Sequence, residues 1–392
     1  MISRRTLLLG AGALAAASRL DLARAHEISH AQALSPAQER TLAASLAQGS
    51  LAQGSLAQGS LAEGWLATGQ VEGGFAPLAL DSGFEADPLA LSPTRLHAIE
   101  PAAHGPLAVA VGRRPGKVAL VLDRAAGKEV ARFAPGGERV FSGHGRFTPD
   151  GTGFLTVEID PASDKGTLAL RSLAGRFEII AEWPTRGPGP HDMLHMGDSL
   201  IIANGGVEPG TPAAVGCEET GANLAILGPD GSARAVFAPG GDLATLSLRH
   251  LARDGAGAVI AAQEISLVPS SKPLLFAIDE TRGLTAYEAP DEAWIGLRGY
   301  IGSVALDASG RIAAAASPRG GRVAFWERTG RYLGFVPFPD GCGLAPTAEA
   351  GRFLATSGYG EVILIAVEDR EPRILARHTG GPRFDNHVSR IA

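Results

Sequence analysis

Five histidines occupy the same position in a long sequence repeat, and imidazole is a side chain that binds metal ions and transfers protons. They are His104, His144, His191, His250 and His387. The chain has 10 His in all, so half of them occur at this one position. If the repeats form a ring, the points at which they begin converge on one axis. The spacing therefore predicts a single histidine-rich site at the mouth of a central channel.

Acidic, basic and polar side chains are expected on the same rim. Glu158 ends the second strand of one repeat, and we expect it to join the histidines as a metal ligand. Imidazole and carboxylate together suit iron, copper or zinc. The further rim residues, expected to bind a partner or ligand, are Arg249, Asp385, Asn386, Asn204, Arg319 and Cys342. The alternative is that the histidines cap strands and bond to backbone carbonyl groups.

The repeat consists of short apolar strands separated by tight turns. One copy runs from His144 to Glu158, with Thr-Pro-Asp-Gly between two apolar segments, and further strands follow. Repeats begin at positions 104, 144, 191, 250, 303, 343 and 387, which lie 40 to 59 residues apart. Four short antiparallel strands in a period of this length are typical of a β-propeller blade. A β-sandwich, the alternative fold, does not predict this period.

The two ends of the repeat region complete one another. Six repeats begin between residues 104 and 343, and the segment 384–391 has the pattern of an innermost strand without its blade. The segment 75–97 supplies outer strands for that blade. Pairing the two ends closes the ring and removes exposed sheet edges. The sequence thus predicts an all-β, seven-bladed β-propeller over residues 75–392.

The N-terminal segment indicates export. Arg4 and Arg5 precede an apolar stretch, and Ala23-Arg24-Ala25 matches a signal-peptidase site. We therefore expect residues 1–25 to be a twin-arginine signal peptide that delivers the folded protein to the periplasm. Export after folding suits a protein that either acquires a cofactor or folds fast in the cytoplasm. No other apolar stretch is long enough to span a membrane.

A low-complexity linker is expected over residues 26–74. It contains tandem LAQGS units, whose glycines oppose a helix and whose leucines form no stripe. A flexible linker is the favoured interpretation, and a pentapeptide solenoid is the alternative. His26-Glu-Ile-Ser-His30 matches the zinc-peptidase motif, but no packed domain is expected to hold it. A copper site at a newly exposed His26 amine is the second option for this motif.

Composition excludes several classes of function. The net charge is −6 and no basic run occurs, so nucleic acid is not an expected partner. The sequence has no GxSxG motif, no GxGxxG after a strand and no P-loop. The two cysteines, Cys217 and Cys342, form no CxxC, which excludes covalent c-type haem and a cysteine-rich zinc site. A disulfide, two unrelated thiols and metal ligation remain open for them.

Several short stretches occur in the order found in one protein family. They include Phe141–Gly151, Gly187–His191, Ala203–Gly206, Ser247–His250, Gly299–Ser303, Ser317–Arg322 and Asp385–His387. On these motifs residues 75–391 resemble an uncharacterised family of exported propellers found alongside imelysin-type iron-uptake proteins. The resemblance implies a quinoprotein-dehydrogenase-like or WD-repeat-like propeller with no proven activity. It also implies a role near periplasmic iron acquisition, with such proteins as partners, and places His144, His191, His250 and His387 in the rim.

The favoured function is that of a periplasmic binding propeller connected with the acquisition of iron or another metal. A metal-dependent hydrolase or a quinone-type oxidoreductase is the alternative, with water activated by a metal on His144, His191 and Glu158. A protein–protein interaction scaffold is the third possibility. Propellers host many functions, so the fold does not choose among them, and no catalytic residue is assigned.

Overall fold

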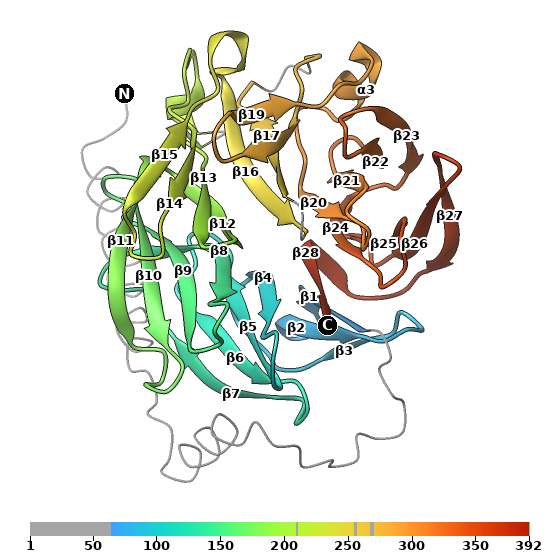
Figure 1. Cartoon of the computed structure of the whole chain (residues 1–392). Helices are drawn as coiled ribbons and strands as arrows, with labels where there is room; N and C mark the ends of the chain where they lie inside the picture. The colour runs from blue at the N-terminus through green and yellow to red at the C-terminus, as the bar shows by residue number, and fades with distance from the viewer. Residues whose placement is uncertain (1–63, 209–210, 255–256, 267–269, 392) are drawn as a thin grey trace, which may run out of the picture. The chain divides into compact units, whose positions relative to one another are not determined.

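The computed structural model describes residues 64–391, apart from 209–210, 255–256 and 267–269. In this part of the chain seven four-stranded antiparallel sheets form the blades of a propeller (Figure 1). The predicted all-β, seven-bladed fold is confirmed. The expected signal peptide, the LAQGS units and the His26–His30 motif lie outside the described residues.

Three blades follow in order from the first complete one, each given from its innermost strand outward. The first has β4 (Leu96–Pro101), β5 (Leu107–Gly112), β6 (Ala119–Asp123) and β7 (Lys128–Phe133). The second has β8 (Val140–Phe147), β9 (Gly153–Ile159), β10 (Lys165–Ser172) and β11 (Ile179–Pro188). The third has β12 (Pro190–Met196), β13 (Ser199–Asn204), β14 (Asn223–Leu227) and β15 (Ala233–Phe237).

Three more blades complete the regular series. The fourth has β16 (Leu246–Arg253), β17 (Ala258–Glu264), β18 (Leu275–Asp279) and β19 (Gly283–Ala286). The fifth has β20 (Ser303–Leu306), β21 (Ile312–Ser317), β22 (Arg322–Glu327) and β23 (Tyr332–Pro337). The sixth has β24 (Gly341–Pro346), β25 (Arg352–Ser357), β26 (Val362–Glu368) and β27 (Glu371–His378).

The seventh blade joins the two ends of the repeat region, as the sequence predicts. Its innermost strand is β28 (Arg383–Ile391), followed by β1 (Gly64–Val71), β2 (Gly74–Leu80) and β3 (Ala86–Pro88). β28 also contacts β24 on one side and β4 on the other, which completes the inner ring. Pairing of β28 with β1 therefore completes a four-stranded blade from the two ends of the repeat region.

The propeller begins earlier than the sequence suggests. The expected linker runs to residue 74, but β1 begins at Gly64 and pairs along its length with β2 and β28. β1 has the same Leu, Ala and Gly composition as the preceding pentads. Only its pairing with strands that arrive from elsewhere in the chain distinguishes it from them.

The core lies between the blades. The middle strands are buried on both faces, so β5 has no exposed residue and reads as a continuous apolar run. One apolar cluster between the closing blade and the first blade joins Leu66 of β1 to Ile99 of β4 and Ala108 of β5. The outermost strands face solvent on one side, and β27 alternates exposed and half-buried residues along its length. This layering holds the innermost strands rigidly around the axis.

Helical structure is sparse among the described residues. It comprises α3 (Asp291–Gly296) and the short 3₁₀ turns η1 (Pro212–Ala214) and η2 (Gly241–Leu243). In the same part of the chain no helix has the length and apolar character required to cross a bilayer.

Candidate metal centre

The innermost strands share a local irregularity at the position that faces the axis. In six of the seven blades the pairing with the next strand shifts register there. A β-bulge redirects side chains, and bulges are frequent beside functional sites. The shifted segments contain His97, His144, His191, His250, Cys342 and His387. The exception is β20, which pairs without a shift and carries no histidine.

Five of these bulges bring their imidazoles together in a closed circle. Neighbouring ring centroids lie 5.0 Å apart for His97–His144, 5.0 Å for His144–His191 and 4.7 Å for His191–His250. The circle continues at 4.8 Å for His250–His387 and closes at 4.6 Å for His387–His97. We call these five residues the channel histidines.

Two overlapping sets of three channel histidines are spaced as metal ligands would be. One set is His97, His144 and His387, and the other is His144, His191 and His250. In each set the three ligand nitrogens lie within 4.8 Å of one another. A metal with nitrogen ligands at about 2.1 Å therefore needs only a small inward movement of the rings.

The channel histidines lie inside the channel, deeper than the mouth that the sequence suggests. His144, His250, His97 and His191 are 1%, 3%, 4% and 9% exposed, and His387 is half-buried. Burial lowers the pKa of all five, and for four of them, all but His97, it does so strongly. The imidazoles are consequently neutral at physiological pH, which leaves a nitrogen lone pair on each ring.

His104 does not belong to this group, contrary to the sequence prediction. It is exposed in the turn between β4 and β5. His97 of β4 takes the place that the prediction assigned to it. The innermost strand of this blade starts at Leu96, eight residues before position 104. The spacing of the histidines could have identified His97, because His97 precedes His144 by 47 residues and His144 precedes His191 by the same interval.

Several imidazole nitrogens in the cluster have no hydrogen-bond partner. They are Nδ1 and Nε2 of His144, Nε2 of His191, Nδ1 of His250 and Nε2 of His387. A buried polar atom without a partner costs about 1–3 kcal/mol, and native structures contain few of them. Such a concentration at one point indicates a site built to bind something between the rings.

A carboxylate orients His97 from behind. Asp385 Oδ1 accepts a hydrogen bond from His97 Nδ1 at 2.9 Å. Asp385 also pairs with Arg95 and with Arg113, whose Nη1 donates to the same oxygen at 2.8 Å. Although burial opposes ionisation, His97 and the arginines hold the pKa of Asp385 well below its usual value. The proton on Nδ1 leaves His97 Nε2 with a free lone pair.

A second carboxylate stands behind His144. Asp192 Oδ1 lies 3.2 Å from His144 Nδ1, although not in line for a hydrogen bond, and 3.3 Å from Arg146 Nη2. Arg146 also pairs with Glu100 at 3.2 Å. Burial raises the pKa of both Asp192 and Glu100. These groups follow the histidines along their strands, and we call them the end-side network.

An arginine stands behind His191. Arg249 Nη1 lies 3.1 Å from His191 Nδ1, and its Nη2 donates to Glu208 at 3.0 Å. Glu208 also accepts from Arg114 Nη1 at 2.7 Å, and Arg114 Nη2 donates to Asp164. Burial opposes ionisation of Glu208, but Arg249 and Arg114 hold its pKa below the usual value. Together with Asp385, Arg95 and Arg113, these residues form the start-side network, on the side where the innermost strands begin.

Comparison with known proteins identifies a family. Residues 90–391 match the family described as "Protein of unknown function (DUF1513)". The chain belongs to this family. No curated protein matches the sequence.

Solved structures support the fold. The chain is similar to a structure described as Kuenenia stuttgartiensis hydrazine synthase, with 13% identity over 76% of this chain and 89% of that chain, at a TM-score of 0.56. It is also similar to a functionally unknown protein from Desulfotomaculum acetoxidans DSM 771, with 11% identity over 71% and 82% of the two chains, at a TM-score of 0.51. At these identities the likeness concerns the fold alone.

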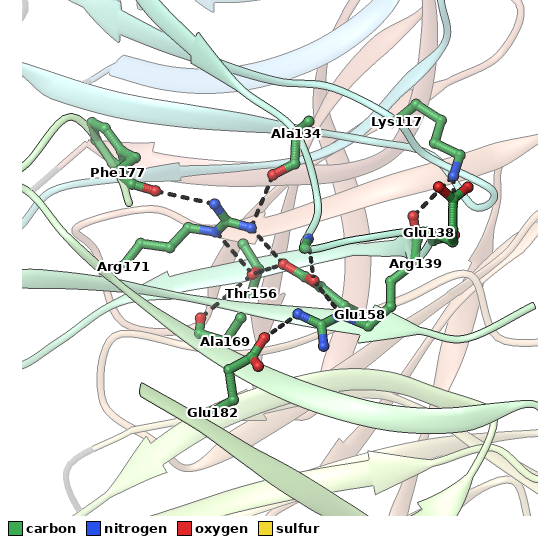
Figure 2. Close-up of polar contacts among 11 residues, drawn as sticks. Lys117, Ala134, Glu138, Arg139, Thr156, Glu158, Ala169, Arg171, Phe177 and Glu182 are labelled. Carbon is green, nitrogen blue, oxygen red and sulfur yellow. Dashed lines mark hydrogen bonds and ion pairs between the residues drawn. The ribbon is translucent and has the colours of Figure 1, made fainter. Parts of the chain in front are cut away.

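The structure does not bring Glu158 to the channel histidines of this DUF1513 propeller. Figure 2 shows its carboxylate between Arg171 and Arg139, which lie 2.6 and 2.9 Å away. The Thr156 hydroxyl also donates to Oε1 of Glu158, and the backbone N–H of Gly136 donates to Oε2. The predicted ligand is thus part of a buried ion cluster within the second blade. Strand alternation sends this side chain toward β10 and the β7–β8 loop rather than to the axis.

Two predicted rim residues, Asn386 and Arg319, both contact Tyr300, which was not predicted from the sequence. Asn386, beside His387, donates to the hydroxyl of Tyr300 at 2.8 Å. The exposed Arg319 guanidinium lies 4.8 Å above the Tyr300 ring. Burial raises the pKa of Tyr300. These contacts connect the neighbourhood of the channel histidines with the protein surface on the start side.

The other predicted rim residues have structural partners. Asn204 is buried and donates to the carbonyl of Thr185 and the side chain of Asn223. Cys342 occupies the bulge of β24, and its Sγ contacts the carbonyl oxygen of Asp385 at 3.4 Å. Cys342 and Cys217 are both free thiols, so neither forms a disulfide.

Proposed function

We propose that this propeller binds one divalent transition-metal ion at the channel histidines. The observation that carries the proposal is the convergence of five imidazoles, four of which have a buried ring nitrogen without a hydrogen-bond partner. Neutral imidazole is the commonest biological ligand of zinc, copper, iron and nickel. A bound ion would use the lone pairs that the surrounding protein leaves without donors.

The favoured ligands are His97, His144 and His387. His97 donates from Nδ1 to Asp385, the arrangement that orients metal-bound histidines and raises their basicity, and Asp192 lies 3.2 Å from Nδ1 of His144 without a hydrogen bond. His387 completes the set within 4.8 Å, and His250 lies beside it as a further ligand. Copper and zinc bind such sites most tightly. Iron would occupy the site where iron is more available than copper or zinc.

We also propose that the protein acts in the periplasm, in the handling of iron or another transition metal. The support is the twin-arginine motif within residues 1–25, together with the resemblance to exported propellers. Loading in the cytoplasm followed by export of the folded protein would let the cell choose the metal. Blocking export in cells that express the full chain should leave it uncleaved in the cytoplasm.

Metal analysis tests the site. Protein purified without chelators should contain close to one equivalent of iron, copper or zinc. Metal-free protein should take up one equivalent of Cu²⁺ or Zn²⁺. The double variant His97→Gln/His144→Gln should lose this binding, whereas His104→Gln should retain it. A wild-type protein that neither contains nor takes up a stoichiometric metal would exclude the proposal.

A metal-dependent enzyme is the second candidate. Three histidine ligands would leave coordination positions for water or substrate, as in catalytic zinc sites. The Co²⁺-loaded protein distinguishes the two candidates through its visible spectrum. A spectral change that titrates near neutral pH reports bound water and favours catalysis. A spectrum independent of pH favours a closed site that only binds the metal.

A further inference from the structure

The contact between Arg249 and His191 determines where His191 carries its proton. A guanidinium group has donors and no acceptor, and it stays charged in proteins. Arg249 Nη1, 3.1 Å from His191 Nδ1, therefore donates to it. Nδ1 must supply the lone pair, so the ring proton is on Nε2. His97 has the opposite arrangement, because the acceptor Asp385 faces its Nδ1.

Nε2 of His191 is consequently an N–H donor without a partner. It is buried, and the ring lies 5.0 Å from that of His144 and 4.7 Å from that of His250. A nitrogen that carries a proton has no lone pair for a metal ion. His191 thus adds a hydrogen-bond donor to a cluster whose other members supply lone pairs.

The charges around the cluster leave a bound cation uncompensated. The start-side and end-side networks together contain five arginines and five carboxylates. A divalent ion would therefore bring two further positive charges into a buried site. Burying unpaired charge is costly, and an anion bound to the metal would reduce that cost.

We propose that the channel metal binds a small anion and that His191 positions it through a hydrogen bond from Nε2. A suitable anion has one atom for the metal and a second acceptor atom for His191, as formate and azide have. The half-exposed Arg95 and the partly exposed Arg113 on the start side would attract it. This inference rests on the proposed metal site. It makes His191 a positioning residue rather than a ligand.

Azide binding to the Cu²⁺-loaded protein tests the inference. Metal content is measured first, and azide is then titrated while the azide-to-copper charge-transfer band is followed. His191→Phe removes the N–H, whereas His191→Gln keeps an acceptor for Arg249 and a donor for the anion. His195→Gln is the matched control, because His195 lies on the same strand outside the channel histidines. Circular dichroism checks the fold of each variant.

His191→Phe should keep one equivalent of copper and bind azide about tenfold to a hundredfold more weakly, as expected for a lost hydrogen bond to a charged group. His191→Gln should bind azide within about threefold of wild type. His195→Gln should behave as wild type. If His191→Phe does not fold, His191→Leu, which also lacks the N–H, takes its place. An amide is a poor copper ligand, so full metal content of His191→Gln shows that His191 is not a ligand.

Three results would overturn the proposal in distinguishable ways. Loss of copper from either His191 variant would make His191 a ligand, while the metal site itself would stand. Full copper content without an azide band in wild type would exclude the anion site alone. Wild-type protein that takes up no copper would remove the proposed function and this inference together.

Discussion

Asp385 accepts a hydrogen bond from Nδ1 of His97 at 2.9 Å, although the two residues lie 288 positions apart in the chain. Asp385 is on β28 and His97 is on β4, so the contact joins the strand that closes the ring to the first strand of the first complete blade. Closure of the propeller and orientation of one proposed metal ligand therefore depend on the same pair of strands.

Replacing Asp385 with asparagine should weaken metal binding by roughly tenfold to a hundredfold, the usual effect of removing a carboxylate behind a histidine ligand. The amide no longer fixes the proton on His97 Nδ1, so the lone pair at Nε2 becomes less available. Competition with a chromophoric chelator measures the affinity. Asp198→Asn disrupts only the exposed pair with Arg234 and should leave the affinity unchanged. Equal affinities for the two variants would contradict the role of Asp385.

The stability of the metal-free protein should fall as the pH drops below about 6.5. Burial lowers the pKa of the channel histidines below the usual 6.5, so the unfolded chain takes up protons that the folded protein does not. Above the unfolded pKa neither state takes up these protons, and the free energy of unfolding keeps its full value. Below it, the free energy of unfolding falls by about 1.4 kcal/mol per pH unit for each histidine that stays neutral in the folded protein. Urea unfolding at a series of pH values measures the slope.

The variant His144→Phe provides the control for this pH dependence, because it removes one neutral imidazole and should reduce the slope by close to one proton. His104→Gln, which changes an exposed residue, should leave the slope as in wild type. A stability that does not vary between about pH 7 and pH 5 would show that the channel histidines are not held neutral.

Glu158 should matter for stability and not for metal binding. Its carboxylate is fully buried, and Glu158→Gln leaves the buried Arg171 without its anionic partner. We expect a loss of about 3 kcal/mol in the free energy of unfolding, since breaking a buried ion pair exposes an uncompensated charge. Glu129→Gln, which disrupts an exposed pair with Arg132, should cost less than about 1 kcal/mol. Loss of metal from folded Glu158→Gln protein would instead restore Glu158 as a ligand.

The start of the folded domain can be tested by truncation. A protein that begins at residue 75 lacks β1, so β2 and β28 lose the strand that lies between them. It also lacks Trp65, which is buried in the core of the closing blade. We expect this protein to aggregate or unfold, whereas one that begins at residue 60 should unfold cooperatively on heating. Equal melting temperatures for the two proteins would place the boundary at residue 75.

Local sequence was sufficient for the architecture. Apolar strands and glycine-containing turns recur at blade-length intervals. This periodicity can be recognised in the sequence without knowledge of any contact between blades. The same phase identified His144, His191, His250 and His387, because each innermost strand begins at an equivalent point. The prediction chose His104 over His97 because both lie near the start of one repeat. Pairing with β5, and not composition, decides where β4 begins.

The chemistry of the site was decided by tertiary structure. Strand alternation shows that Glu158 and its neighbours face opposite ways, but which face meets the axis depends on how the sheets are arranged. The proton positions on His97 and His191 depend on Asp385 and Arg249, and these contacts span 288 and 58 positions in the chain. No periodic pattern encodes such pairs, because these hydrogen bonds join neighbouring blades and exist only once the blades have packed side by side.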